Sequence, residues 1–277
     1  MSGIASVETW SGKGRADENF PVGSLLIRRD LRAHVHAFYD FARNADDIAD
    51  SHTLAPEEKI SRLNIMEDVL LGRRHDGSPS ALRLRDSLAR TGVTTRHSTD
   101  LLVAFRQDAT KRRYETVEEL HEYCRYSAAP VGRHVLDLHG ENHITHSPSD
   151  ALCTSLQILN HLQDCAVDLE RLDRCYLPRT MLARFGGSTE DLRRSSASDG
   201  LRLVFNELLQ LVERMNHSAM DLPRRTRNRR LRLETAVIVG LAVRLQKRLE
   251  REDPLAARVK LRKPDIASSM IFAVRFI

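Results

Sequence analysis

The stretch Asp46-Asp47-Ile48-Ala49-Asp50 decides the fold class and points to the chemistry, together with its later counterpart Asp164-Cys165-Ala166-Val167-Asp168. Each stretch lacks glycine and proline, and each carries two carboxylates four residues apart, a spacing that predicts one acidic side on a helix. Two such helices facing each other would surround a cavity with at least four acidic side chains. The pattern therefore predicts an all-α protein with a magnesium site.

Polar residues extend the second acidic pair into a stripe. Gln157 and Asn160 precede Asp164 and Asp168 at steps of three, four and four, so all four project in nearly one direction. On the first helix Arg43 lies one turn before Asp46, where a cation would hold an anion bridged by metal ions. Magnesium binds through a few carboxylates and leaves positions for phosphate oxygens. We therefore expect a phosphorylated substrate, with Asn160 as a fifth metal ligand beside the four aspartates.

A simpler interpretation exists for each pair, because acidic residues four apart on a helix are usually solvated surface. The sequence context argues against it, since residues 34–39 and 156–162 are apolar enough to be buried. Buried carboxylates are costly unless they are paired or bound to metal. Gln157 and Asn160 could instead satisfy each other in the core, and this alternative stays open.

Length and periodicity favour one large helical domain. The chain has 277 residues, enough to bury a substantial core. We expect a flexible Ser/Gly-rich segment over residues 1–18 and a single helical domain over residues 19–277. No stretch alternates with period two for long enough to form a sheet.

Helix signals recur along most of the chain. Turn residues and apolar spacing predict helices over residues 31–52, from Pro56, and over 80–91, 97–112 and 117–127. A break is expected near Pro130 and Gly132, and a loop over residues 139–148. The second acidic helix should start at Pro148 and end before Tyr176. Two more long helices are expected over residues 191–221 and 232–251, with a basic linker between them.

The charge pattern limits the classes of partner. The net charge is +5, and Lys and Arg gather in residues 224–230 and 258–263. Such clusters attract anionic surfaces, but no aromatic interleaving or nucleic-acid motif accompanies them, so nucleic acid is not expected as a partner. No signal peptide and no membrane-spanning run of about 20 apolar residues is visible. We expect a cytoplasmic protein, soluble or peripheral at the inner membrane surface.

Residues 270–277 are apolar apart from Arg275 and follow a basic segment. They could dip into the headgroup layer of a membrane. Alternatively they pack as a last helical turn against the body of the protein. The sequence leaves both interpretations open.

Five motifs in this order resemble the squalene/phytoene synthases. They are residues 18–22, 39–50, 123–132, 157–168 and 174–178. Within that family the amino-acid sequence of residues 18–22, 123–133 and 159–165 is similar to that of the bacterial hydroxysqualene synthase branch. That branch acts in squalene and hopanoid biosynthesis. The resemblance covers most of the chain.

The resemblance implies an isoprenoid-synthase fold with a central cavity, a diphosphate at its acidic mouth and a hydrocarbon in its depth. In that branch the substrate is presqualene diphosphate, and water captures the cation to give hydroxysqualene and diphosphate. Two or three Mg²⁺ ions are expected, without NADPH. Enzymes upstream and downstream in the pathway are the expected partners.

The candidate site combines these observations. The catalytic candidates are Asp46, Asp50, Asp164, Asp168 and Tyr123, whose hydroxyl is expected near the diphosphate end. The substrate-binding candidates are Arg43, Asp47, Gln157, Asn160, Arg174, Phe20, Tyr39 and Gln246. Aromatic faces can stabilise a carbocation, although Phe38 and Tyr39 are equally explained as packing residues.

Gln246 marks a departure from relatives that make squalene or dehydrosqualene, which often carry a tyrosine near this place. An amide beside the cation could position a water molecule. Two other functions stay open: a head-to-head prenyl transferase that condenses two farnesyl or geranylgeranyl diphosphates, and a catalytically inactive scaffold. The intact acidic pairs argue against the scaffold.

Overall fold

The structure is a computed structural model and describes residues 6–8 and 27–276. Phe20, the motif of residues 18–22 and most of the expected flexible segment lie outside the described residues. Throughout the described residues every regular element is a helix, apart from one isolated bridge between Arg113 and Cys175. The expected all-α class is therefore confirmed. The chain divides into two compact units, Met1–Thr110 with Arg133–Glu141, and Lys111–Gly132 with Asn142–Ile277.

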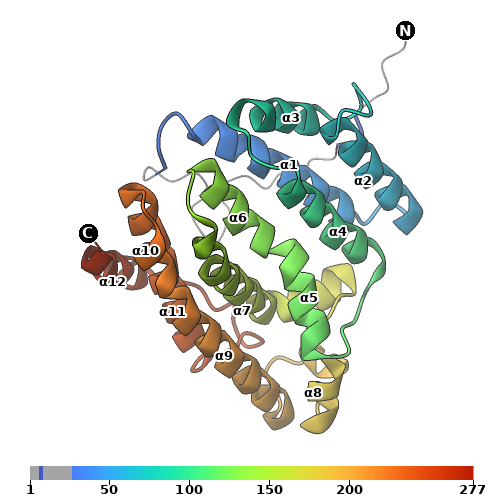
Figure 1. Cartoon of the computed structure of the whole chain (residues 1–277). Helices are drawn as coiled ribbons and strands as arrows, with labels where there is room; N and C mark the ends of the chain where they lie inside the picture. The colour runs from blue at the N-terminus through green and yellow to red at the C-terminus, as the bar shows by residue number, and fades with distance from the viewer. Residues whose placement is uncertain (1–5, 9–26, 277) are drawn as a thin grey trace. The chain divides into compact units, whose positions relative to one another are not determined.

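Four helices and most of a fifth build the first unit (Figure 1). They are α1 (Arg32–Asp50), α2 (Pro56–Leu70), α3 (Pro79–Thr91), α4 (Arg96–Thr110) and most of α6 (Ala129–Leu138). α1 and α2 both pack against α3 and α4. Phe41, Ile48, Leu63 and Met66 are fully buried in this core. The packing fixes the rotation of α1 and thereby which of its acidic residues stay accessible.

Local signals explain where these helices begin and end. Pro56 starts α2, where its missing N–H costs nothing, and two glutamates follow in the first turn. The hydroxyl of Ser78 caps α3 by accepting a hydrogen bond from the backbone N–H of Ala81. α3 ends at Thr91 and is followed by Gly92, whose φ of 71° lies in the left-handed region that favours glycine.

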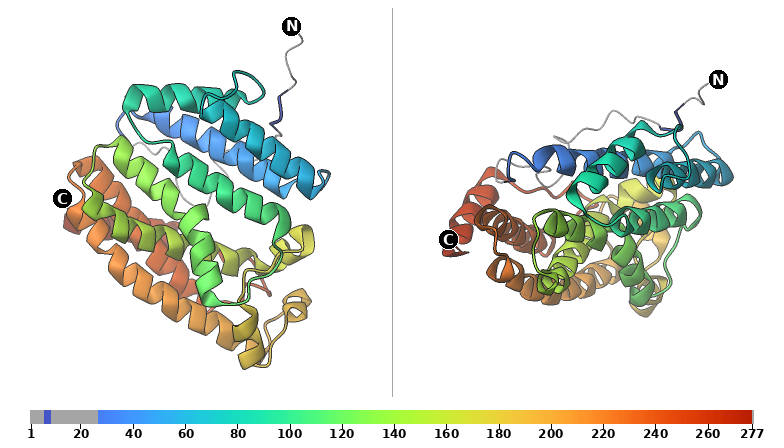
Figure 2. Two further views of the ribbon diagram at one scale, coloured as in Figure 1. Left: turned by 45° about the vertical axis from the view of Figure 1, so that its right-hand side comes forward. Right: turned by 45° about the horizontal axis from the view of Figure 1, so that its top comes forward.

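The second unit contains the remaining helices. They are α5 (Val117–Ser127), η1 (His143–Thr145), α7 (His146–Leu172), α8 (Arg179–Arg184), η2 (Thr189–Arg193), α9 (Asp199–Ala219), α10 (Asp221–Arg225), α11 (Arg229–Leu249), α12 (Lys263–Ala273) and η3 (Val274–Phe276). α7, α9 and α11 pack against one another, and α12 runs along α11 (Figure 2). The long helix α7 carries the second acidic pair.

Three expectations about helix boundaries are wrong. The helix expected over residues 191–221 is broken, because the Ser198 hydroxyl caps a new helix, α9, at the backbone N–H of Leu201. α7 begins at His146, earlier than the expected Pro148, directly after η1. α11 begins at Arg229 and so takes in part of the expected basic linker.

α5 ends at Ser127, and α6 begins two residues later with Pro130 in its first turn. The expected break thus falls just before the proline. Gly132 has a different role, because a Cβ atom there would collide with the Ser149 hydroxyl and approach the Cys153 sulfur to 2.8 Å. Its absence of a side chain lets the start of α6 lie against α7.

No described helix combines the length and the apolar character needed to cross a bilayer.

Candidate active site

The first acidic pair lies near the end of α1, where Arg43 binds two neighbouring carboxylates. Its Nη1 is 3.1 Å from Oδ2 of Asp46, while its Nε and Nη2 donate to Oδ1 of Asp47 at 3.0 and 2.6 Å. The Asp46 side chain is 33% exposed, whereas that of Asp47 is 2% exposed. Asp47 is therefore the buried partner that orients Arg43, and Asp46 stays accessible.

The electrostatic surroundings of Asp46 favour a cation. Its pKa is raised well above the ordinary value, first because the surrounding protein desolvates the carboxylate and second because Asp50 lies near it. Arg43 opposes this effect, and Asp108 of α4 adds to it. Carboxylates that repel one another at a half-exposed site are the arrangement that a divalent cation neutralises.

Asp108 is an acidic neighbour that the sequence reasoning missed. Its side chain is a carboxylate, yet the residue is 3% exposed. A signal was present, since Asp108 continues the apolar face of α4 through Leu101 and Phe105 at helical spacing. A carboxylate on an apolar helix face indicates a buried charge with a partner or a role.

The second acidic pair lies on α7, and Arg258 covers part of it. Nε and Nη2 of Arg258 lie 3.0 and 3.1 Å from Oδ1 and Oδ2 of Asp164, which forms a two-pronged ion pair. The Asp164 side chain is 26% exposed and that of Arg258 is 50% exposed. Asn160 and Asp168 are half-buried on the same side of α7. The donors accessible on α7 are thus amide and carboxylate oxygens.

Gln157 pairs with a histidine one turn further along α7. Its Nε2 lies 3.2 Å from Nε2 of His161. The partner of Gln157 is therefore His161 and not Asn160, as the alternative had it. Its role in substrate binding stays a prediction.

Tyr123 belongs to an aromatic cluster within the second unit. Its ring centroid lies 5.4 Å from that of Tyr114, 5.3 Å from that of Tyr176 and 5.9 Å from that of His161. His161 stacks on Tyr176 with 3.6 Å between centroids. The buried Arg174 donates from Nη1 to the Tyr176 hydroxyl at 3.5 Å.

This cluster joins two residues predicted for the site to three that were not, Tyr114, His161 and Tyr176. Burial lowers the pKa of His161 to about 3, and the nearby charge of Arg174 adds to the effect. His161 is therefore neutral at physiological pH. The cluster is a buried group of aromatic rings to which the imidazole adds no charge.

Gln246 lies in a chain of hydrogen bonds between α7, α9 and α11 that is buried from Ser155 to Gln246 and ends at the exposed Glu250. Its Oε1 accepts from Nδ2 of Asn216 at 2.8 Å, and its Nε2 donates to Oε1 of Glu250 at 2.8 Å. Oδ1 of Asn216 in turn accepts from the Ser155 hydroxyl at 2.6 Å. The amide is thus fixed in one orientation by protein groups on both sides.

Comparison with known proteins identifies the family. The sequence profile described as Squalene/phytoene synthase matches residues 13–265. The chain belongs to the squalene/phytoene synthase family. It is 45% identical over 255 residues to a hydroxysqualene synthase of Rhodopseudomonas palustris, covering 92% of this chain and 87% of the relative. It is 44% identical over 245 residues to a hydroxysqualene synthase of Sinorhizobium fredii, covering 88% and 84%.

Solved structures agree with this assignment. A squalene synthase from Alicyclobacillus acidocaldarius superimposes with a TM-score of 0.75 at 30% identity, covering 86% of this chain and 90% of that one. A dehydrosqualene synthase superimposes with a TM-score of 0.73 at 22% identity, covering 90% and 87%, which supports the fold alone. The protein has the all-α isoprenoid-synthase fold and is an enzyme of the squalene/phytoene synthase type.

The oxygen donors on α1, and separately those on α7, fit the divalent metal ions that this family generally uses. Every accessible candidate ligand offers oxygen, which is the donor that hard cations such as Mg²⁺ prefer. The carboxylates are half-buried on ordered helices rather than on loops. Which of the predicted residues bind metal stays a prediction.

Phe38 and Tyr39 differ in their surroundings within this squalene/phytoene synthase. Phe38 is 4% exposed and stacks on His134 with 3.8 Å between ring centroids. This contact supports the packing interpretation of Phe38. Tyr39 is half-buried, and its role at the site stays a prediction.

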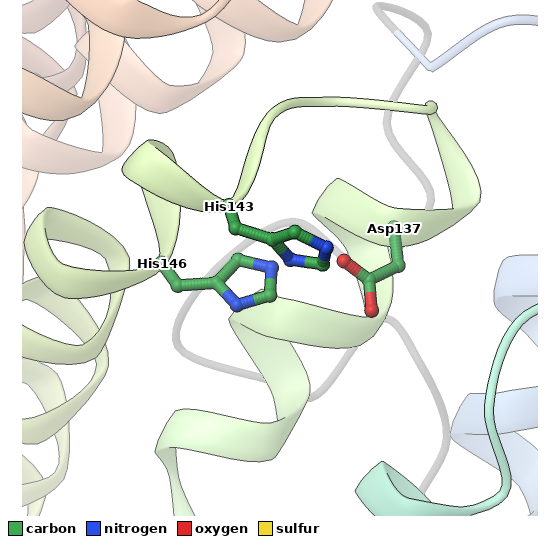
Figure 3. A group of neighbouring side chains, drawn as sticks. All are labelled: Asp137, His143 and His146. Atoms are coloured by element: carbon green, nitrogen blue, oxygen red, sulfur yellow. The ribbon is translucent and has the colours of Figure 1, made fainter.

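Two histidines lie where α7 begins, separated from its acidic pair. The rings of His143 and His146 meet edge to face with 4.8 Å between centroids (Figure 3). A helix rises about 1.5 Å per residue, so His146 is about 27 Å from Asp164 along α7. Asp137, also drawn in Figure 3, belongs to the first unit, where its Oδ2 lies 2.7 Å from Nε2 of His97.

A hollow of about 380 Å³ also opens near the start of α7. It is lined by Ser147, Pro148, His217, Ser218, Met220, Asp221, Arg224 and Arg225. None of the predicted site residues is among these, so this hollow is not the central cavity that the sequence predicts.

Proposed function

We propose that this enzyme ionises presqualene diphosphate with the help of Mg²⁺ and lets water capture the resulting cation, which gives hydroxysqualene and diphosphate. The observation that carries this proposal is the accessible carboxylate pair on each of two helices, with an arginine bound to one member of each pair. The relatives named hydroxysqualene synthase support the choice of substrate, since they are 40–45% identical over most of the chain.

Asp46 and Asp50 of α1, with Asn160, Asp164 and Asp168 of α7, would hold two or three magnesium ions. When bound, these ions neutralise the departing diphosphate and lower the barrier to breaking the carbon–oxygen bond. The chain's own contribution is to keep these oxygen donors on rigid helices. This ordering reduces the reorganisation needed when substrate binds.

Arginines would share the negative charge of the diphosphate. Arg43 is already held at the α1 carboxylates by the buried Asp47, so its guanidinium has one defined orientation. Arg174 is fixed beside Tyr176. A planar guanidinium suits the oxygens of a phosphate and keeps its charge at any physiological pH.

The cationic intermediate needs surroundings that neither repel it nor react with it. Tyr123, in contact with Tyr114 and Tyr176, offers ring faces that stabilise positive charge. The neutral His161 stacked on Tyr176 adds no repulsion. Phe20 and Tyr39 are proposed to provide further aromatic rings for stabilising the cation.

Gln246 is proposed to place the water that captures the cation. Its carbonyl oxygen and amide nitrogen are held by Asn216 and Glu250, which gives the side chain a fixed position in a buried setting. A fixed polar group can direct one water molecule while the apolar surroundings exclude others.

A second function is a head-to-head prenyl transferase that condenses two prenyl diphosphates. Its support is weaker, because a phytoene synthase of Narcissus pseudonarcissus is 30% identical over 195 residues and the match covers 45% of that relative. Both functions need the same acidic pairs. The substrate therefore separates them.

The test supplies purified enzyme and Mg²⁺ with either presqualene diphosphate or farnesyl diphosphate as sole substrate and analyses the products by gas chromatography. We expect hydroxysqualene from presqualene diphosphate and no consumption of farnesyl diphosphate. Consumption of farnesyl diphosphate alone would establish the prenyl transferase instead. Under the proposed function, an upstream enzyme must form the cyclopropyl diphosphate and a downstream enzyme must remove the hydroxyl group.

A further inference from the structure

α12 packs against α11 through one side only. Nε of Arg248 lies 2.7 Å from Oδ2 of Asp265, and Nη2 of Arg244 donates to the Ser268 hydroxyl. At Gly240 a Cβ atom would meet the Cβ atom of Ser269 at 3.0 Å. In these three contacts the residue number in α11 falls as the residue number in α12 rises, so the two helices are antiparallel.

The opposite side of α12 is apolar and exposed. Four large side chains are exposed there, those of Ile266, Met270 and Ile271 in α12 and of Val274 in η3, and they are 43, 59, 73 and 61% exposed. Their spacing places them on one helix face, which we call the outer face of α12. A helix that is apolar on both sides normally lies in a core, and contiguous exposed apolar surface marks an interaction site.

Basic residues surround this outer face. Arg262 precedes α12, Lys263 begins it, Arg275 follows it, and all three are exposed. Because the helices are antiparallel, the end of α12 points toward the start of α11, where Arg229 and Arg230 are exposed. The one acidic residue of α12, Asp265, is already paired with Arg248 on the inner side.

We propose that the outer face of α12 docks on an anionic lipid bilayer. Its apolar side chains enter the boundary between headgroups and acyl chains, and the surrounding Arg and Lys side chains bind lipid phosphates. Charge favours this occupant over a second copy of the chain. A symmetric dimer through the same face would bring two basic rims together, where like charges repel.

This inference does not depend on which prenyl diphosphate the enzyme uses. It rests on exposed residues that take no part in the candidate active site. Binding can therefore be measured by itself, and failure of the proposed reaction would leave it standing.

The experiment measures flotation of the full chain with two kinds of vesicle, pure phosphatidylcholine and phosphatidylcholine mixed with phosphatidylglycerol. We expect flotation with the anionic vesicles and a decrease as salt is raised. The double variant Met270→Glu/Ile271→Glu should reduce the bound fraction by about tenfold or more, because two charges would have to enter the apolar layer. Arg229→Gln/Arg230→Gln should weaken binding to a smaller extent.

Matched controls come from exposed apolar residues elsewhere in the same unit. Ile144 and Leu203 are 57 and 49% exposed, and Ile144→Glu and Leu203→Glu should leave flotation unchanged. Point variants are preferable to removal of residues 269–277, because Ser269 and Ala273 are buried and deletion would also remove packing against α11. Circular dichroism melting checks that each variant folds.

Two results would overturn the proposal. One is equal flotation of wild type and Met270→Glu/Ile271→Glu, with both folded. The other is that the wild type does not float with the anionic vesicles. Size-exclusion chromatography with light scattering then shows whether the wild type is a monomer or a dimer that the double variant dissociates. The dimer would make the face a self-association surface.

Discussion

Nη2 of Arg43 lies 2.6 Å from Oδ1 of Asp47, a carboxylate that is almost completely buried between two more accessible acids of α1. The contact gives the neighbouring aspartates of this acidic stretch different roles. Asp47 orients the arginine, and Asp46 and Asp50 are the residues that we propose bind the metal ions. Substitutions at adjacent positions should therefore have different consequences.

Asp47→Asn should reduce the free energy of unfolding by about 2 kcal/mol, because it leaves a mostly buried guanidinium with a weaker partner. Urea unfolding followed by circular dichroism measures this. The loss stays moderate since Arg43 keeps Asp46 as a second partner at 3.1 Å. An Asp47→Asn protein that is as stable as wild type but lacks turnover would show that Asp47 contacts substrate instead.

Asp46→Asn should leave stability unchanged or increase it, since a carboxylate whose pKa is raised in the fold opposes folding at neutral pH. Turnover should fall by about a hundredfold or more, because a metal ligand is lost. Diphosphate release measures turnover, and the urea midpoint measures stability. Full activity of Asp46→Asn at saturating Mg²⁺ would contradict the assignment of Asp46 as a ligand.

Arg258→Gln should lower the Mg²⁺ concentration needed for half-maximal activity by a few fold. The guanidinium of Arg258 binds both oxygens of Asp164, so a metal ion must compete with it for that carboxylate. Arg262→Gln is a matched control on the same segment, because its nearest acidic partner is Glu252. A higher Mg²⁺ requirement in Arg258→Gln would mean that Arg258 helps to bind the diphosphate.

Gln246→Leu should shift the products from alcohol toward alkene if the amide places the capturing water. It should also destabilise the fold by about 1–3 kcal/mol, because the buried Asn216 loses a hydrogen-bond partner. Ser155→Ala removes the neighbouring hydrogen bond to Asn216, leaves the contacts of Gln246 in place and controls for loss of stability. Unchanged products in Gln246→Leu would leave the residue a purely structural role.

Stability should fall as the pH is lowered below 6.5. Burial lowers the pKa of His134 in the folded protein to about 3, with the nearby His97 as a second cause. The ordinary pKa of histidine is 6.5, so between pH 6.5 and pH 3 this imidazole is protonated in the unfolded chain but neutral in the folded protein. This difference lowers the free energy of unfolding by about 2 kcal/mol at pH 5. Thermal melts at pH 7 and pH 5 measure the loss.

His134→Leu should remove that part of the pH dependence. Among the described residues neither ring nitrogen of His134 has a hydrogen-bond partner, so the substitution sacrifices little at neutral pH apart from the stacking on Phe38. Identical pH dependence in wild type and His134→Leu would show that another group governs acid sensitivity.

Helix existence could be predicted from local signals wherever caps and breakers are strong. α5 has the expected bounds because Thr116 caps it and α6 begins two residues after its end. The prediction of one helix over residues 191–221 is wrong because it followed the apolar spacing and gave no weight to the serines before α9. One of them, Ser198, caps α9. Capping by a side chain competes with helix continuation, and periodicity alone does not register it.

The site could be predicted only as far as spacing along one helix reaches. The step of four residues places Asp164 and Asp168 on one side of α7 without further information. The contact between Asp164 and Arg258 joins residues 94 positions apart, and no local pattern encodes it. The same holds for the burial of Asp47, which depends on how α1 packs in the first unit.

The central claim is that carboxylates of α1 and α7 hold the same metal ions around diphosphate. Electron paramagnetic resonance of Mn²⁺ titrated into the protein with inorganic diphosphate measures it, using wild type, Asp46→Asn, Asp164→Asn and the double variant. We predict that either single variant abolishes most diphosphate-dependent Mn²⁺ binding and that the double variant loses little more. Single losses that are partial and sum to the loss in the double variant would mean two independent sites and would contradict the account.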